Sequence, residues 1–255
     1  MPSKELTAAL DAARAAGEVI QRLYRRNLAI TIKADRSPVT EADVQAEQAI
    51  RAVLGPRFPG YGFYGEETGR HAMEAENIWL VDPIDGTKSF VRDCPFFSTQ
   101  IALMRGGQLV LGVSSASAYG ELAWAEAGQG AFLDGQPIRV SAVSELASTI
   151  LSTGNLKSLA ADQKNWRRFG ALVGRVNRLR GYGDFVHYHL LARGALDAVV
   201  ESDVNILDIA ALAVIVREAG GTFTQLDGQP VTLATTTVLA TNGALHVSML
   251  AAVGG

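Results

Sequence analysis

Two acidic residues, Asp82 and Asp85, lie in the stretch 82–87, which reads Asp-Pro-Ile-Asp-Gly-Thr. Its proline and glycine favour a sharp bend, so both carboxylates can face one point. Gly86 and Thr87 add small backbone N–H and hydroxyl donors that suit a phosphate group. The stretch therefore predicts a metal site beside a phosphate site, the combination that a magnesium-dependent phosphatase requires.

A purely structural turn is the competing interpretation, because Asp-Pro and Asp-Gly pairs are common turn formers. Two further acids argue against it: Glu66 follows an aromatic stretch upstream, and Asp208 begins a long apolar helix downstream. Taken alone, Glu66 would be an exposed glutamate, and Asp208 a favourable charge in the first turn of a helix. Neither interpretation explains why these acids occur together in this order.

In order along the chain, Gly65-Glu66-Glu67, the stretch 82–87 and the helix from Asp208 resemble the inositol monophosphatase superfamily of Mg2+-dependent, lithium-sensitive phosphomonoesterases. The resemblance covers nearly the whole chain, from the first helix to Gly221. It implies an α/β (α+β) fold, a layered αβαβα sandwich, with two or three Mg2+ ions in the active site. It also implies a homodimer, and direct attack of water on the phosphate without a phosphoenzyme.

The resemblance assigns five metal ligands. Glu66, Asp82 and the backbone carbonyl of Ile84 would bind the first Mg2+. The second would be bound by Asp82, Asp85 and Asp208, with a weaker third ion near Glu66. Carboxylate and carbonyl oxygens, without His or Cys, are the ligands that Mg2+ prefers. Paired ions about 3.5–4 Å apart can activate water, neutralise the phosphoryl oxygens and stabilise the leaving oxygen.

The resemblance names Glu66, Thr87, Asp43 and Lys33 as catalytic residues. Thr87 would position the attacking water by its hydroxyl, paired with Asp43. Asp43 also fits a helix cap with Thr40, and capping alone is the alternative. Lys33 would lie near the water and the phosphate, and a surface lysine is the alternative.

The segment 183–188, Gly-Asp-Phe-Val-His-Tyr, resembles the histidinol-phosphatase branch of the superfamily. Carboxylates at Asp184 and Glu201 could pair with the ammonium group of histidinol phosphate. Glu201, however, also stands where inositol phosphatases bind sugar hydroxyls, and Leu207 departs from the tryptophan usual in both branches. We therefore expect L-histidinol phosphate, in histidine biosynthesis, with inositol 1-phosphate as the alternative. The residues expected to contact substrate are Asp85, Gly86, Thr87, Asp184 and Glu201.

Other functions fit the sequence less well. Nucleotide 3′-phosphatases and sugar bisphosphatases usually carry longer insertions around the pocket, and a non-catalytic binding protein would be expected to lose a metal-binding acid. No Gly-x-Gly-x-x-Gly follows a strand and no P-loop occurs, which argues against a dinucleotide oxidoreductase and an ATPase. His187 and His189 alternate at a polar helix start, where surface or packing roles are more common than metal binding.

Composition limits the partners. The net charge of −3 gives no electrostatic footprint for nucleic acid. The longest apolar run, 209–216, is too short to span a membrane, and the N-terminus lacks the apolar core of a signal peptide. The single cysteine, Cys94, excludes an internal disulfide. We therefore expect a cytoplasmic protein whose partner is a small-molecule phosphate.

The pattern of apolar residues predicts one unit, 1–255, with an N-terminal α+β half of about 1–145 and a C-terminal α/β half of about 146–255. Expected helices are 3–26, Thr40 to Gly55-Pro56, 160–175, 184–193, 207–219 and one from Ala244. Expected strands are 77–81, 98–104, 109–117, 121–126, 131–133, 138–140, 149–153, 178–180, 197–201 and 236–240. Asp134-Gly135 is expected to close a hairpin.

Overall fold

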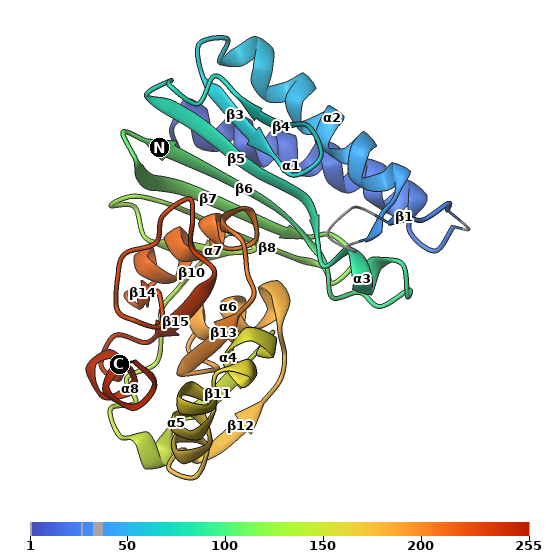
Figure 1. Ribbon diagram of the computed structural model, residues 1–255. Coiled ribbons are helices and arrows are strands. Elements are labelled where there is room, and N and C mark those ends of the chain that lie inside the picture. The colour runs from blue at the N-terminus through green and yellow to red at the C-terminus, as the bar shows by residue number, and fades with distance from the viewer. Residues whose placement is uncertain (1, 27, 33–37, 255) are drawn as a thin grey trace.

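The computed structural model describes residues 2–26, 28–32 and 38–254, which form alternating layers of helix and sheet (Figure 1). Helices α1 (Lys4–Leu23) and α2 (Glu41–Arg57) cover one face of an eight-stranded sheet. Between this sheet and a five-stranded sheet lie α6 (Asp184–Ala192) and α7 (Ile206–Glu218). The outer face of the small sheet is covered by α4 (Lys157–Ala161), α5 (Gln163–Val173) and α8 (His246–Val253). The expected αβαβα sandwich is confirmed.

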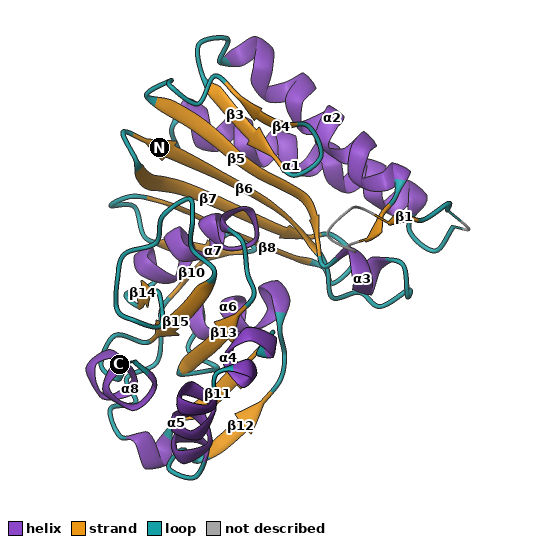
Figure 2. Cartoon of the chain, in the orientation of Figure 1, coloured by secondary structure: helices purple, strands orange, loops and turns teal. Residues whose placement is uncertain are grey.

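The strands form a large and a small mixed sheet, both visible in Figure 2. The large sheet has the order β10-β9-β8-β7-β6-β5-β3-β4, with β3 (Gly62–Gly65), β4 (Gly69–His71), β5 (Asn77–Asp85), β6 (Ser98–Arg105), β7 (Gln108–Ala116), β8 (Glu121–Glu126), β9 (Ala131–Leu133) and β10 (Gln136–Ile138). The small sheet has the order β12-β11-β13-β15-β14, with β11 (Ile150–Thr153), β12 (Arg178–Arg180), β13 (Ala198–Ser202), β14 (Thr222–Thr224) and β15 (Thr237–Thr241). A separate two-stranded sheet pairs β1 (Thr31–Ile32) with β2 (Pro38–Val39), and short helices are α3 (Thr87–Phe90) and η1 (Leu146–Ser148).

Strand β5 is buried on both faces, because it lies between two helical layers. Ile78 and Leu80 join the core shared with α6 and α7, whereas Trp79 and Val81 join the core under α1 and α2. Alternate side chains of a strand point to opposite faces, so a continuous apolar run fits this position. Burying each large side chain contributes about 1.5–3 kcal/mol. The end of β5 is thereby fixed between the two cores.

The acidic stretch is a bulged strand, not the free turn that its composition suggests. Strand β5 continues through Asp85 and still pairs with β6, Asp82 opposite Gln100 and Asp85 opposite Ser98. The register shifts between the two aspartates, as in a β-bulge. A bulge re-aims side chains without ending the strand.

The helix expected near 160–175 is present as α5, but it begins only at Gln163, because Asp162 interrupts the helical conformation. This residue has non-helical dihedrals, φ −91° and ψ 112°, and its carboxylate accepts the backbone N–H of Asn165 at 2.8 Å. Such an N-cap begins a new helix, so α4 and α5 are separate. Other differences are small: α2 runs on to Arg57.

Strands β1, β2, β3, β4 and β14 were not predicted, because each has only two to four residues and a weak apolar pattern. The strand expected at 138–140 lies instead at 136–138, as β10. The hairpin is confirmed: Asp134 and Gly135 both have positive φ, as its tight turn requires.

None of the helices in the described part of the chain combines the length and the apolar character that a membrane span needs.

Candidate active site

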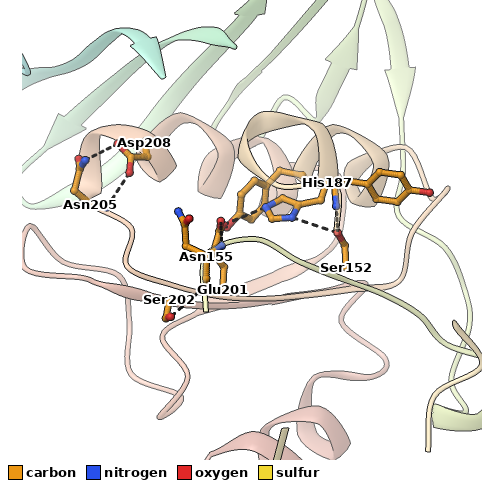
Figure 3. Close-up of polar contacts among 9 residues, drawn as sticks. Ser152, Asn155, His187, Glu201, Ser202, Asn205 and Asp208 are labelled. Atoms are coloured by element: carbon orange, nitrogen blue, oxygen red, sulfur yellow. Dashed lines mark hydrogen bonds and ion pairs between the residues drawn. The ribbon is translucent and has the colours of Figure 1, made fainter. Parts of the chain in front are cut away.

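Three carboxylates converge at the end of β5. Asp82, Asp85 and Asp208 each offer an oxygen, and these oxygens lie within 4.8 Å of one another. The bulge presents the first two, and α7 presents the third in its first turn. Asn205 caps α7, and its backbone N–H donates to Asp208 Oδ2 at 3.0 Å (Figure 3). This reciprocal cap fixes the carboxylate toward the cluster.

Crowding and burial oppose ionisation of these acids. Burial, followed by the charges of Glu66, Asp85 and Asp208, raises the pKa of Asp82 well above its usual range. Burial also raises the pKa of Asp85, with the charge of Asp184 as the next cause. Burial raises the pKa of Asp208 to about 7, although hydrogen bonds from Asn205 lower it. A divalent cation would relieve this repulsion.

The donor set fits Mg2+, because every side-chain donor in the cluster is a carboxylate oxygen. Glu66 lies within hydrogen-bonding reach of Asp82, so the structure brings this fourth acid to the same place. The backbone of Ile84 is also close, because its N–H donates to Asp82 Oδ1 at 2.9 Å. All five residues expected to bind metal therefore lie in one region.

The expected pairing of Thr87 with Asp43 is present. The hydroxyl of Thr87 lies 3.1 Å from Asp43 Oδ1 and 3.0 Å from the carbonyl oxygen of Ile84. Asp43 also caps α2, because its Oδ2 accepts from the backbone N–H and the hydroxyl of Thr40, both at 2.7 Å. The two alternatives are thus combined in one carboxylate. Burial raises the pKa of Asp43, against lowering hydrogen bonds from Thr40 and Thr87.

Gly86 has a left-handed conformation, with φ of 91°, at the start of α3. A Cβ there would lie 2.8 Å from the carbonyl oxygen of Phe96. Glycine is therefore required both for the backbone angle and for space. The first N–H groups of a helix have no partner within it, so Gly86 and Thr87 present donors beside the cluster. Lys33, the remaining residue expected to be catalytic, lies outside the described residues.

Glu47 was missed by the sequence analysis. Its carboxylate is fully buried and accepts the backbone N–H groups of Glu67 at 2.8 Å and Thr68 at 3.0 Å. A Cβ on Gly65 would lie 2.5 Å from this carboxylate, which explains the glycine before Glu66. Glu47 therefore holds the loop that carries Glu66. The available signal was its position one turn after Asp43 on α2.

Asp184 and Glu201 lie beside the acidic cluster. Asp184 begins α6 with a positive φ of 45°. Burial, followed by the charge of Glu201, raises its pKa to about 6, while His187 and Lys88 act to lower it. The charges of Asp184 and Glu201 also act on Asp85, so the two acids face the same region.

Glu201 is held by three donors (Figure 3). Its Oε2 lies 2.8 Å from the hydroxyl of Tyr188 and 3.1 Å from His187 Nε2, and its Oε1 accepts the N–H of Asn155 at 3.2 Å. Burial by itself raises the pKa of Glu201, but His187, Tyr188 and Asn155 outweigh it and leave the pKa lowered. A Cβ on Gly154 would lie only 1.8 Å from Oε1, so this wall of the site requires glycine.

His187 and His189 are buried, with 0 % and 1 % exposure. Of the two roles expected, surface or packing, the surface role is wrong, and so is the polar helix start, because most of α6 is buried. His189 lies 3.0 Å from Glu121 and 2.9 Å from the hydroxyl of Ser114. The two histidines therefore serve different hydrogen-bond networks.

Comparison with known proteins identifies the family of this chain. A family model described as the inositol monophosphatase family matches residues 1–254. A histidinol-phosphatase of Mycobacterium tuberculosis is 43% identical over 98% of both chains, and an inositol-1-monophosphatase of Mesorhizobium japonicum is 34% identical over 97% of this chain and 95% of its own. The crystal structure of the extragenic suppressor protein suhB from Bartonella henselae superposes with a TM-score of 0.89, at 30% identity over 98% of both chains.

Proposed function

The chain belongs to the inositol monophosphatase family, and within this family we propose that it hydrolyses L-histidinol phosphate. The family makes it a metal-dependent phosphomonoesterase. The substrate is the part that we infer. The observation that carries it is a pair of acids, the half-buried Asp184 and the buried Glu201, beside the cluster formed by Asp82, Asp85 and Asp208.

An ammonium group on the leaving alcohol suits this pair of acids. Asp184 has its pKa raised to about 6 by burial and by the charge of Glu201, so two carboxylates share one poorly solvated region. A cation bound between them would favour the ionised form of both. A neutral polyol would leave their repulsion uncompensated. Charge therefore favours an amino alcohol as the leaving group.

Asp82, Asp85 and Asp208 would hold Mg2+, and Glu66 with the Ile84 carbonyl would extend the site to two or three ions. Bound Mg2+ would neutralise the phosphoryl oxygens and lower the pKa of a nearby water. The remaining chemistry belongs to side chains and backbone groups of this chain.

Thr87 and Asp43 would orient the attacking water. The threonine hydroxyl has one proton, which it can donate to Asp43, and a free lone pair that can then accept from water. Burial raises the pKa of Asp43, which makes it a better acceptor for that proton. Gly86 and Thr87 would donate backbone N–H groups to the phosphate.

Inositol 1-phosphate is the second candidate, because an inositol-1-monophosphatase is among the relatives and Glu201 can also accept hydrogen bonds from hydroxyl groups.

A homodimer and a cytoplasmic location remain proposals. The side chains of Phe96 and Tyr119 are 39% and 40% exposed, and their ring centroids lie 5.9 Å apart. Such a pair of exposed aromatic residues suits a subunit interface.

The test is phosphate release from L-histidinol phosphate, inositol 1-phosphate and adenosine 3′,5′-bisphosphate, each with Mg2+ and with a chelator. We expect Mg2+-dependent release with a preference for L-histidinol phosphate. Asp184→Asn, which tolerates a positive φ, should raise KM for L-histidinol phosphate about tenfold and KM for inositol 1-phosphate much less. A preference for inositol 1-phosphate supports the second candidate, and no release from any ester contradicts an enzymatic role.

A further inference from the structure

A chain of hydrogen bonds, buried from Ser152 onward, connects the segment before Asp184 to Glu201 (Figure 3). The backbone N–H of Tyr182 donates to the hydroxyl oxygen of Ser152 at 3.3 Å. This hydroxyl lies 3.4 Å from His187 Nδ1, and His187 Nε2 lies 3.1 Å from Glu201 Oε2. His187 therefore stands between the two segments that carry the acids of the leaving-group region.

The direction of these hydrogen bonds follows from their members. The ionised carboxylate of Glu201 can only accept, so Nε2 of His187 must carry a proton and donate it. In the neutral ring, Nδ1 is then an acceptor and takes the proton of the Ser152 hydroxyl. The Ser152 oxygen in turn accepts from Tyr182. Tyr182 only donates, Glu201 only accepts, and Ser152 and His187 each donate once and accept once, so the chain is internally consistent.

The Ser-His-Glu order resembles a nucleophilic triad, but the burial excludes that role. Ser152 is 0 % exposed and His187 is 0 % exposed, so no substrate can reach the serine oxygen in this fold. The Ser152 oxygen also already accepts from Tyr182. What the chain can do is fix the position of the carboxylate at its end.

We propose that His187 is a positioning residue that holds the Glu201 carboxylate in the orientation needed to select the leaving alcohol. The inference rests on the proposed function in that it places Glu201 in the leaving-group pocket. Without the His187 donor, Oε2 would keep Tyr188 as its only side-chain donor among the residues that the structure describes. The other oxygen, Oε1, would keep the longer hydrogen bond from the backbone N–H of Asn155, at 3.2 Å, and would face Gly154, which has no side chain. The carboxylate would therefore be held less firmly.

His189 provides a matched control. It lies two residues further along α6, is equally buried, and bonds to Glu121 and Ser114 instead of Glu201. Replacing either histidine by phenylalanine removes a similar buried polar ring from the same helix. Only the change at position 187 should affect Glu201.

The experiment compares His187→Phe, His187→Gln and His189→Phe in the Mg2+-loaded enzyme. For each, kcat and KM are measured with L-histidinol phosphate and inositol 1-phosphate, and binding of the product L-histidinol is measured by calorimetry. We expect His187→Phe to reduce the preference between the two esters, measured as the ratio of their kcat/KM values, about tenfold, chiefly through KM. Binding of L-histidinol should also weaken about tenfold, which corresponds to a loss of about 1.4 kcal/mol of binding free energy. His187→Gln keeps an N–H donor near the position of Nε2 and should recover most of the ratio. His189→Phe should keep it.

The inference is overturned if His187→Phe keeps the parental ratio, if His187→Gln loses it as fully as phenylalanine does, or if His189→Phe narrows it equally. Should His187→Phe fail to fold, the smaller apolar variant His187→Leu takes its place, because a merely structural role predicts that removing the N–H donor changes neither the ester ratio nor L-histidinol binding. The proposed function fails separately, if the parental enzyme prefers inositol 1-phosphate. In that case the inference stands only if His187→Phe reduces the preference of the enzyme for inositol 1-phosphate over L-histidinol phosphate.

Discussion

The hydroxyl of Thr87 lies 3.1 Å from Asp43 Oδ1, although 44 positions separate the two residues. The contact joins the first turn of α2 to the first turn of α3, directly beside the acidic cluster. Asp43 cannot rotate away, because Thr40 donates twice to its other oxygen. A hydroxyl held in this way has a defined lone-pair direction.

Replacing Thr87 with valine should therefore lower kcat about 100-fold or more, the range expected when a positioned proton-transfer partner is lost. Thr87→Ser keeps the hydroxyl and should stay within about tenfold of the parental value. Initial rates at saturating Mg2+ would test both, with circular dichroism as a control for folding. Equal activity of the valine and serine variants would remove Thr87 from the reaction.

Asp85→Asn should abolish turnover while leaving the fold intact, because Asp85 shares its site with Asp82 and Asp208. We expect kcat to fall at least about 100-fold, as when a main electrostatic stabiliser is lost. The metal-free variant should be more stable than the parent, since one repelling charge is gone. Thermal unfolding with a chelator would measure this, with exposed Asp93→Asn as the control. Normal phosphatase activity in Asp85→Asn would contradict the assigned metal site.

The stability of the metal-free protein should fall as pH rises from 6.5 to 8. Burial raises the pKa of Asp208 from its ordinary 3.8 to about 7, and the pKa values of Asp82 and Asp85 are also well raised. The fold therefore holds protons that the unfolded chain has lost, and this stability disappears as pH rises through the folded-state pKa values. His189 and His246 have lowered pKa values, so their effect lies below pH 6.5.

Mg2+ should reverse this trend, because it favours the ionised carboxylates. The measurement is the thermal midpoint at several pH values, with a chelator and with Mg2+. In a chain of this size, about 1 kcal/mol corresponds to about 2 °C. A thermal midpoint that rises with pH in the metal-free protein would argue against a shared ion at these acids. So would a midpoint at pH 8 that does not change when Mg2+ is added.

Glu47→Gln should weaken Mg2+ binding although Glu47 is not itself a proposed ligand. Its carboxylate accepts two backbone N–H groups of the loop that follows Glu66, and such outer partners typically change metal affinity or activity 10–100-fold. The Mg2+ concentration for half-maximal activity should rise about tenfold. Exposed Glu41→Gln on the same helix should leave it unchanged. An equal Mg2+ requirement in both variants would show that the loop does not depend on Glu47.

Gly86→Ala should destabilise the protein more than Gly69→Ala, although both glycines have positive φ. A Cβ at position 86 would lie 2.8 Å from the Phe96 carbonyl oxygen, whereas nothing lies within 4 Å of one at position 69. The shared backbone cost is about 1–2 kcal/mol, so the difference between the variants isolates the clash. Denaturation by urea gives this difference directly. Equal decreases in the free energy of unfolding would mean that the backbone at Phe96 can shift to make room for the Cβ at little energetic cost.

The sequence predicted the parts of the site that depend on residue type and order. Asp82 and Asp85 could be grouped because they share one short stretch, whereas Asp208 was added to them by the resemblance to the inositol monophosphatase superfamily. The capping pair of Thr40 and Asp43 was also readable, because a cap is a local signal.

What the sequence could not show depends on partners distant in the chain. The bulge between Asp82 and Asp85 is defined by register with β6, which a linear pattern does not reveal. Glu47 looks like any helical glutamate until the loop 20 positions later donates to it. The segment from Asp184 to His189 was expected to be a polar helix start, because two histidines and an aspartate outweighed the apolar residues between them, yet His187 and His189 are buried.

Asp208 reaches the cluster from α7, which is made late in synthesis, whereas Asp82 and Asp85 are made early. A growing chain on the ribosome thus carries two of these acids long before the third is available. Strong Mg2+ binding at this cluster must wait until α7 has emerged and packed between the two sheets. Metal uptake would then be one of the last events in the maturation of the enzyme, and a chain truncated before α7 would remain an inactive, metal-poor protein.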